Sequence, residues 1–407
     1  MSNLSRRGFL AASAAGIAAS SYAQVAGANE RLKVGAIGCG GMAQGHMQTL
    51  MKNRDTDNVE ILAVCDLYQK RLDAAAKLTG AKPVSDYRAI LDDKFIDYVL
   101  IATPEHWHSK ITLDAADAGK HIYCEKPMTR TIDQAKRVVS GVKGGKIKMQ
   151  VGVQGLSDES YQKAYELIRT GAIGTVVLAQ IDYSRNTDSP NFLATHDPDP
   201  DLQPGVNFDW NRWLGSAPKV PFEANRFLNW REYWDYSGGV SSDLFVHRVT
   251  RLIKALGLTF PERGSAAGGK FCFKDSPAEI PDTLTALLDY PQGLTVQLIS
   301  SMANGAPVEH MIRGHKATIV FTHTGYTVRP EPLFKKELQE ITYKKTGAED
   351  IGLHHRNLMN AIRKNDPLNC DVMLGYYGVV ASEMVVQSYR QRKYLRWDAK
   401  REKLVKA

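Results

Sequence analysis

A lysine and a carboxylate stand side by side in His121-Ile122-Tyr123-Cys124-Glu125-Lys126-Pro127, a segment that predicts a short β-strand stopping at Pro127. In open sheets of parallel strands, the crevice beyond the carboxyl ends of the strands holds the ligand. We therefore expect the chemistry of the protein to take place beside Glu125 and Lys126. Glu125 is expected to contact a ribose or to position Lys126.

A second pair of residues suits proton transfer. Asp243 and His247 follow the turn-forming segment Tyr236-Ser237-Gly238-Gly239-Val240, so they should lie near the start of a helix. Residues four apart share one face of a helix. The pKa of an ordinary imidazole lies near neutrality, which makes His247 a candidate general base, with Asp243 orienting it or relaying the proton. Taken alone, such a pair is most often an ordinary surface pair.

The element expected to hold a cofactor comes early in the chain. An apolar strand at 32–37 runs into Gly38-Cys39-Gly40-Gly41-Met42-Ala43, the G-x-G-x-x-A form of the dinucleotide fingerprint, and then into a helix reaching about Lys52. Gly38 permits the tight turn, Gly40 lets the backbone approach a pyrophosphate, and the helix N-terminus attracts the anion.

An acid follows the next predicted strand. The apolar run 59–65 ends at Asp66, whose carboxylate would accept hydrogen bonds from the adenosine ribose and repel a 2′-phosphate. This favours NAD over NADP, although Lys70 and Arg71 nearby weaken the preference. Because strand, glycines, helix, strand and acid occur in order, the pattern is more specific than a glycine-rich turn alone.

Alternating strands and helices continue to about residue 153. The strand 98–102 leads into Thr103-Pro104-Glu105-His106-Trp107-His108 and a helix, and the strand 148–153 ends the unit. Repeated βα units of this length predict an α/β fold with a doubly wound parallel sheet. Later strands with period-2 alternation, such as 282–290 and 294–300, predict a second domain with a large sheet.

An irregular stretch at 185–236 holds four of the six tryptophans. Such a stretch in a compact protein is usually a covering loop over a functional site or an oligomer contact. The tryptophan rings could stack on a sugar, although packing within the loop is their commoner role. His354 and His355 begin a later helix, where a surface position is the default and a place in the pocket the alternative.

Three motifs resemble those of one known family. The segments 38–43 (GCGGMA), 102–108 (ATPEHWH) and 124–127 (CEKP) are similar to motifs of the glucose-fructose oxidoreductase, inositol dehydrogenase and rhizopine-catabolism family. The resemblance covers essentially the whole chain after the leader. It implies an NAD-binding Rossmann domain at 31–154 and a substrate-binding α+β domain at 155–407. The second domain should have an open, mostly antiparallel sheet and could return its C-terminal helix to the first.

The resemblance also carries roles to individual residues. It implies that the lysine of the Glu-Lys-Pro motif lies near nicotinamide and substrate, and that Asp-x-x-x-His supplies a catalytic pair. The candidate catalytic residues are therefore Lys126, Asp243 and His247. The candidate cofactor-binding residues are Gly38, Gly40, Gly41, Met42, Asp66, Thr103, Pro104, His108, Glu125, Lys126 and Gln154. The candidate substrate contacts are Trp107, Trp230, Arg231 and Tyr236, and no metal site is expected.

The first residues predict an export signal. Ser5-Arg6-Arg7-Gly8-Phe9-Leu10 precedes an alanine-rich run to about Ala19, a pattern typical of the twin-arginine export route. The run is too short for a membrane span. We expect residues 1–28 to be a twin-arginine signal peptide, recognised by the export machinery, and the mature protein to be periplasmic. A disordered cytoplasmic tail is the alternative.

Composition limits the partners. The formal charge is +8, or +6 without Arg6 and Arg7 of the leader, and the one dense basic run is 390–406. We interpret that run as a solvated surface rather than a nucleic-acid site, because no aromatic platform is interleaved with it. The five cysteines are odd in number and form no CxxC pair, which argues against a disulfide framework.

The sequence thus predicts an exported, NAD-dependent oxidoreductase acting on a sugar or polyol. Because the periplasm has no free NAD pool, the cofactor would be loaded in the cytoplasm and held tightly. An enzyme that cleaves glycosides by transient oxidation is one alternative, which the Glu-Lys-Pro motif disfavours. A non-catalytic sugar-binding protein that contains NAD is the other, disfavoured by the intact catalytic candidates. An open sheet with an apolar face favours a homodimer or homotetramer.

Overall fold

The computed structural model describes residues 30–407 except 145, 191–198 and 347–349. The predicted leader at 1–28 therefore lies outside the described residues. Among the helices that are described, none combines the length and the apolar character needed to cross a membrane.

The first domain is built on a six-stranded parallel sheet in the order β3-β2-β1-β4-β5-β6. Its strands are β1 (Leu32–Ile37), β2 (Val59–Cys65), β3 (Lys82–Val84), β4 (Tyr98–Ile101), β5 (His121–Glu125) and β6 (Met149–Gly152). The helices between them are α2 (Gly41–Lys52), α3 (Gln69–Thr79), α4 (Arg88–Leu91), α5 (Glu105–Asp117) and α6 (Ile132–Lys143). The predicted doubly wound fold is confirmed.

The strands of this sheet are apolar because both of their faces are covered. Every residue of β4 and of β6 is buried, as expected where helices pack on the two sides of a parallel sheet. Short edge strand β3, which contains Pro83, was not expected from the sequence. Proline is tolerated at such an edge because its missing amide hydrogen is not needed there.

The second domain contains a ten-stranded sheet in the order β14-β13-β12-β11-β7-β10-β9-β8-β15-β16. The strands are β7 (Val176–Asp182), β8 (Arg263–Gly269), β9 (Thr283–Tyr290), β10 (Leu294–Ser301), β11 (Met311–Gly314), β12 (Ala317–Thr322), β13 (Gly325–Pro330), β14 (Ile341–Lys344), β15 (Leu395–Asp398) and β16 (Lys403–Lys406). Pairing is antiparallel throughout the described strands, except between β7 and β10. The expected large, mostly antiparallel sheet is thus confirmed.

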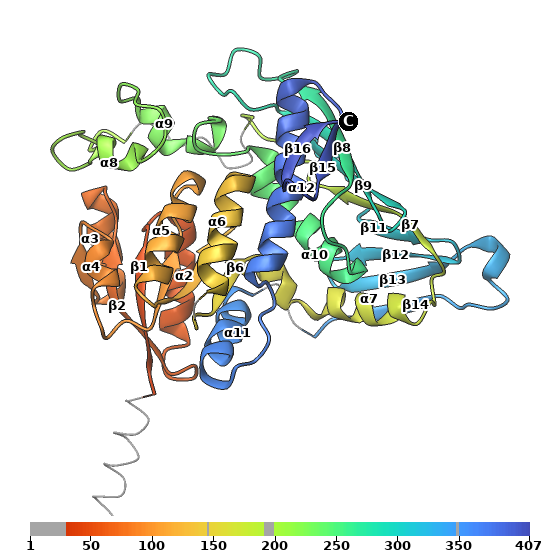
Figure 1. The fold of residues 1–407 in the computed structure, drawn as a ribbon, viewed down its shortest axis with the longest axis horizontal. Helices are drawn as coiled ribbons and strands as arrows, with labels where there is room; N and C mark the ends of the chain where they lie inside the picture. The colour runs from red at the N-terminus through yellow and green to blue at the C-terminus, as the bar shows by residue number, and fades with distance from the viewer. Residues whose placement is uncertain (1–29, 145, 191–198, 347–349) are drawn as a thin grey trace, which may run out of the picture.

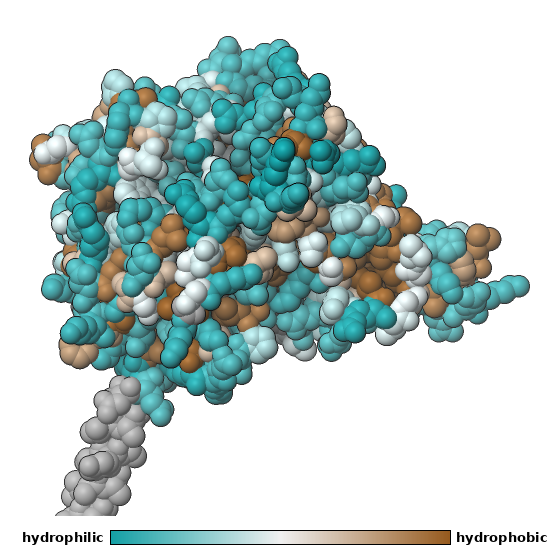
Figure 2. Space-filling view, in the orientation of Figure 1, coloured by the Kyte–Doolittle hydropathy of each residue, from teal (hydrophilic) through white to brown (hydrophobic). Residues whose placement is uncertain are grey.

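One face of this sheet is covered by helices and the other is open. In β10 every second residue is buried, the pattern of a strand that is solvated on one side. The helical segments of the second half of the chain are η1 (Gln154–Ser157), α7 (Glu159–Arg169), α8 (Trp210–Leu214), α9 (Ala224–Leu228), η2 (Trp230–Glu232), η3 (Ser241–Phe245), α10 (Val246–Leu256), η4 (Pro332–Phe334), α11 (Ile351–Lys364) and α12 (Val372–Gln391). Apolar side chains show on the surface beside the strands on the right of Figure 2.

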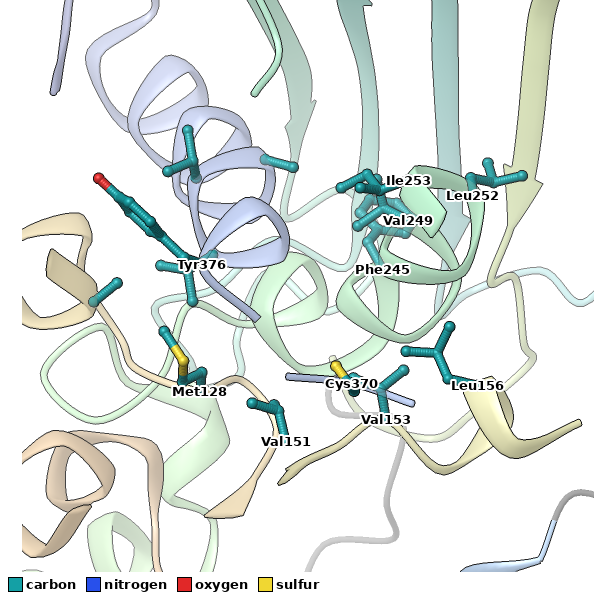
Figure 3. Packing of buried hydrophobic residues seen from close by; sticks show 14 of the residues in the cluster. Met128, Val151, Val153, Leu156, Phe245, Val249, Leu252, Ile253, Cys370 and Tyr376 are labelled. Carbon is teal, nitrogen blue, oxygen red and sulfur yellow. The ribbon is translucent and has the colours of Figure 1, made fainter. Parts of the chain in front are cut away.

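Two late helices join the domains. Helix α12 crosses between α6 of the first domain and α10 and β8 of the second, as Figure 1 shows in dark blue. Buried side chains from both domains meet at this junction, among them Met128, Val151, Phe245 and Tyr376 (Figure 3). Helix α11 packs beside α2 on the first domain. The last part of the chain therefore completes the first domain's core.

The tightness of this junction leads to a first prediction. A Cβ added at Gly378 of α12 would lie 2.5 Å from Oγ1 of Thr250 on α10. At Gly141 of α6, the nearest atom to an added Cβ is the flexible end of Leu113, 3.0 Å away. Gly141→Ala should stabilise the protein by up to about 1 kcal/mol through helix propensity. Gly378→Ala should destabilise it by about 1–3 kcal/mol through overpacking.

Urea unfolding of both variants measures this difference. The close packing of α12 on α10 would be contradicted if the two alanine substitutions shifted the unfolding midpoint equally and in the same direction.

Candidate active site

A cleft opens at the carboxyl ends of the parallel strands, where the sequence places its motifs. The ends of β1, β2, β4 and β5 form one wall, and the segment around α8, α9 and η2 forms the other. Most of the predicted cofactor and substrate residues line this cleft: Gly38, Gly40, Gly41, Met42, Asp66, Thr103, Pro104, Trp107, His108, Glu125, Lys126, Trp230, Arg231 and Asp243. Residues that are about two hundred apart in the sequence thus face one space.

The glycine turn leaves room for a ligand. Gly38 has a φ of +90°, and a Cβ there would lie 2.7 Å from the carbonyl oxygen of Ala102, so a side chain is excluded. A Cβ at Gly41 would meet nothing within 4 Å. Helix α2 begins at this glycine without a side-chain cap, which leaves its first amides available to an anion. This geometry fits the pyrophosphate of a dinucleotide.

Asp66 stands where a ribose would be bound. Its Oδ2 accepts from the amide of Cys39 at 2.8 Å, and its Oδ1 accepts from the amide of Tyr68 at 2.9 Å. Both carboxylate oxygens are thereby fixed beside the glycine turn. Of the two neighbouring cations, Lys70 turns away to Asp199 and Asp201, whereas Arg71 lines the cleft.

Two cations hold one carboxylate at the inner end of the cleft. Nζ of Lys126 donates to the backbone carbonyl of Asp243 at 2.9 Å and also to Oδ1 of its carboxylate. Nε of Arg231 donates to Oδ2 at 2.7 Å. Burial alone would raise the pKa of Asp243, but Arg231 and Lys126 outweigh it and lower the pKa to about 2. The carboxylate is therefore ionised at neutral pH.

Asp243 does not orient His247, contrary to the sequence-based expectation. Both of its oxygens are engaged by Lys126 and Arg231, and Nδ1 of His247 has no hydrogen-bond partner within the described part of the chain. The reason is local geometry, because Asp243 lies in the π-helical turn η3 and His247 in the α-helix that follows. Burial, and then the charges of Lys126 and Arg251, lower the pKa of His247 well below its usual value.

Three predicted site residues do not line the cleft. His247 lies on α10, four residues after Asp243 of η3, and Gln154 starts the short helix η1 after β6. Tyr236 is fully buried, because its ring packs against those of Trp213 and His106 at centroid distances of 4.8 and 5.1 Å. Its side chain belongs to the interior of the covering segment.

The covering segment, residues 199–236, packs around an aromatic cluster that also includes Tyr68 of the first domain. Trp210 and Trp213 stack at 4.9 Å and pack with Phe208 and Phe227. This packing role is the one judged commoner for the tryptophans. In Figure 1 the segment, with α8 and α9, lies across the top of α3 and α5. The carbonyl of Trp213 accepts from Nε1 of Trp107 at 2.7 Å, which fixes the cover to the first domain.

Glu105 is a buried residue of the site that had not been predicted. Its carboxylate accepts from the hydroxyls of Ser237 and Ser242 at 2.8 and 2.9 Å, and from the amide of Gly238 at 3.1 Å. It thus joins α5 of the first domain to the turn that carries Asp243. Burial, and then the charge of Asp243, raise its pKa to about 7. The serines of the segment 237–242 were the available signal in the sequence, but they did not indicate which residue they bind.

No group of three or more histidine, cysteine, aspartate or glutamate side chains in the described ranges is arranged to hold a metal ion.

These features define a dinucleotide-binding Rossmann domain followed by a second α+β domain that contributes residues to the same cleft. Residues 32–153 match the oxidoreductase family with an NAD-binding Rossmann fold, and residues 206–396 match the C-terminal alpha/beta domain of the same family. The chain belongs to this family, named Gfo/Idh/MocA.

Individual relatives agree with this assignment. Inositol 2-dehydrogenase 2 of Saccharopolyspora erythraea is 32% identical over 188 residues, which cover 45% of this chain and 53% of that protein. Levoglucosan dehydrogenase of Pseudarthrobacter phenanthrenivorans is 37% identical over 122 residues, 29% of this chain and 31% of that protein. The chain spans about half the length of the first curated relatives it matches.

Solved structures share the fold over most of the chain. Levoglucosan dehydrogenase in complex with NADH and levoglucosan has a TM-score of 0.70 at 20% identity, over 90% of this chain and 99% of that one. The WlbA dehydrogenase of Bordetella pertussis in complex with NADH and UDP-GlcNAcA has a TM-score of 0.68 at 20% identity, over the same shares.

The buried Glu105 gives a second prediction. Its pKa in the folded protein, about 7, exceeds the ordinary value, so the unfolded chain releases this proton at lower pH. The contribution of this group to the free energy of unfolding is complete at acidic pH and is lost as pH rises from about 4.3 to 7, by about 4 kcal/mol. Glu105→Gln should remove this loss, which urea unfolding at several pH values would measure.

The exposed Glu166 of α7, paired with Lys163, provides the control. Glu166→Gln should leave the pH dependence of unfolding unchanged. If the free energy of unfolding changed with pH equally in Glu105→Gln and in the wild type, Glu105 would not be protonated in the folded protein.

Proposed function

We propose that this protein is an exported, NAD-dependent oxidoreductase that transfers hydride between a carbinol carbon of a sugar or polyol and a tightly held cofactor. The observation that carries the proposal is the buried pair of Lys126 and Asp243, joined by the partly exposed Arg231, in a dinucleotide cleft. A buried ammonium held by a carboxylate next to a cofactor cleft suits a group that donates to a reacting oxygen.

The residues of the cleft fit the cofactor from one end to the other. The uncapped amides of α2 would hold the pyrophosphate, and Asp66 the adenosine ribose. The hydroxyl of Thr103 is buried without a partner in the described structure and lines the same cleft, so it can donate to the ligand. Bound NAD would supply the hydride acceptor, beside Glu125 and Lys126.

The proton steps belong to the protein. Lys126 would donate a hydrogen bond to the substrate oxygen, and Asp243 and Arg231 keep its ammonium in place. His247, whose lowered pKa leaves it neutral, would accept the hydroxyl proton as the carbinol hydrogen leaves as hydride. For that transfer the substrate hydroxyl must come within hydrogen-bond distance of Nδ1 of His247, which has no hydrogen-bond partner in the described part of the chain.

The substrate class is supported by the relatives and by the cleft. The relatives named above include an inositol dehydrogenase and a levoglucosan dehydrogenase, which points to a polyhydroxylated substrate. Trp107 and Trp230 line the cleft, and the Arg231 guanidinium lies 4.2 Å from the Trp230 ring centre. Aromatic faces and charged donors together suit a sugar or polyol.

Export and cofactor retention are part of the same proposal. The twin arginines Arg6 and Arg7 support transport of a folded protein to the periplasm. The covering segment over the cleft, with its aromatic cluster, supports retention of a cofactor loaded before export.

We also propose a homo-oligomer, dimeric or tetrameric. Val177 of β7, Leu287 of β9 and Ile341 of β14 are exposed apolar residues on the ten-stranded sheet. Exposed apolar surface of this kind is often covered by a second copy. Light scattering of the purified protein would decide the assembly.

Substitution of the lysine tests the proposed chemistry. Lys126→Met should lower kcat for sugar oxidation by about a hundredfold or more, since a donor to the developing alkoxide is removed. NADH affinity should remain within a few-fold, as measured by fluorescence titration. Lys110→Met, which alters an exposed lysine paired with Asp114, is the control and should keep full activity. Turnover by the Lys126 variant at the wild-type rate would refute the assignment.

A screen of sugars against the protein as purified, without added cofactor, tests retention and reaction type together. Reduced-nicotinamide absorbance that appears on adding a polyol or aldose would show oxidation by a co-purified cofactor. Release of an aglycone without a lasting absorbance change would indicate glycoside cleavage instead. Sugar binding with neither signal would indicate a non-catalytic binding protein.

The leader is tested separately. Replacing both Arg6 and Arg7 by lysine should leave the precursor in the cytoplasm, because the export route reads the arginine pair. Cell fractionation and immunoblotting measure the distribution. Unchanged periplasmic recovery of this variant would show that export does not depend on the arginine pair.

A further inference from the structure

A line of buried polar side chains runs from the cleft through the first domain. Oε1 of Glu125 lies 3.0 Å from Nε2 of His46, and Nδ1 of His46 lies 2.9 Å from Nε2 of His355. The hydroxyl of Tyr98 lies 3.5 Å from Nδ1 of His355. These residues come from β5, α2, α11 and β4, and the two histidine side chains are fully buried.

This position corrects the default expectation for the late histidines. His354 and His355 lie neither on the surface nor in the cleft, because α11 inserts both into the core of the first domain. Only His355 joins the line to Glu125. His354 instead contacts the hydroxyl of Ser157 at 2.7 Å and the carbonyl of Val151 at 2.9 Å.

The ionised carboxylate of Glu125, at the cleft end of this line, sets the direction of the hydrogen bonds. Burial alone would raise the pKa of Glu125, but His46 and the nearby Lys126 lower it below its usual value. An ionised carboxylate can only accept, so Nε2 of His46 carries the hydrogen. With His46 neutral, its Nδ1 accepts from Nε2–H of His355, and the Tyr98 hydroxyl faces Nδ1 of His355.

Packing holds the two rings in this arrangement. The His355 ring stacks on Tyr123 with centroids 4.1 Å apart and an interplanar angle of 20°. The His46 ring meets both Tyr123 and His355 edge-on at 5.1 Å. Rotation of either imidazole would disturb the neighbouring rings. The packed His46 ring therefore fixes the orientation of the Glu125 carboxylate through its hydrogen bond.

We propose that His46 and His355 are positioning residues that hold the Glu125 carboxylate towards the nicotinamide end of the cleft. A helix near the C-terminus of the chain thereby completes the cofactor site. The inference rests on the proposed function, since it takes a nicotinamide dinucleotide as the ligand. A supporting chain of this kind fixes a binding group by hydrogen bonds to the residue that contacts the ligand.

NADH binding to the full-length protein, freed of cofactor, tests the proposal without any substrate. His46→Leu should raise the Kd for NADH about tenfold, since a hydrogen bond to a buried charge is lost, and His355→Leu about fivefold. His355→Gln should restore the affinity to within about twofold, because the glutamine amide can donate in place of Nε2–H. His354→Leu, a matched change one residue away, should lower Tm but leave the Kd unchanged.

Two further readouts separate positioning from stability alone. The KM for NAD should rise in the His46 and His355 leucine variants while kcat changes little. In the wild-type protein, ¹⁵N NMR of the histidine rings should show hydrogen on Nε2 of both His46 and His355. If the leucine variants do not fold, this spectrum of the wild-type protein tests the proposal. A neutral His46 with its hydrogen on Nδ1 would overturn the proposal.

Failure of the positioning role and failure of the proposed function give different results. Wild-type Kd values in folded His46→Leu and His355→Leu would refute the positioning role whatever the substrate. Weakened NADH binding in both, in a protein that oxidises no sugar or polyol, would support the positioning role and refute the proposed reaction instead.

Discussion

The contact between Lys126 and Asp243 crosses the boundary between the two domains, and the arrangement of the site depends on it. Each residue is buried, and a buried charge without a partner is strongly destabilising. The first domain therefore supplies an ammonium whose direct hydrogen-bonded carboxylate, Asp243, comes from the second. Arg231, from the covering segment, adds a second cation to the same carboxylate. The parallel sheet, the covering segment and η3 thus meet at the carboxylate of Asp243. Movement of any one of them alone would break a hydrogen bond to this carboxylate.

Local motifs made much of the fold predictable. The glycine turn, Asp66 and the strand end at Glu125 depend on residues close in sequence, and each appears where its pattern indicates. Period-2 alternation likewise indicated β9 and β10 because one face of that sheet is solvated. The short edge strand β3 gave no such signal, because three residues with a proline are too few to show a pattern.

Partnerships between distant residues were not predictable. Asp243 and His247 are four apart and were expected to act together, but tertiary contacts bring Lys126, 117 residues away, to the carboxylate instead. The sequence likewise does not reveal that His46 meets His355, 309 residues later. Spacing along a chain predicts which residues share a face of one helix. It does not predict which other element that face meets.

The return of α11 to the first domain bears on how the protein is made. Leu358 and Met359 of α11 belong to the same buried cluster as Val34 and Tyr98 of the parallel sheet. During synthesis this side of the sheet stays open until almost the entire chain has left the ribosome. The segment made first is thus finished last, and an incomplete chain exposes apolar surface. The first domain can complete its folding only after α11 has been synthesised. A route that transports folded proteins would therefore act on this chain only after that point.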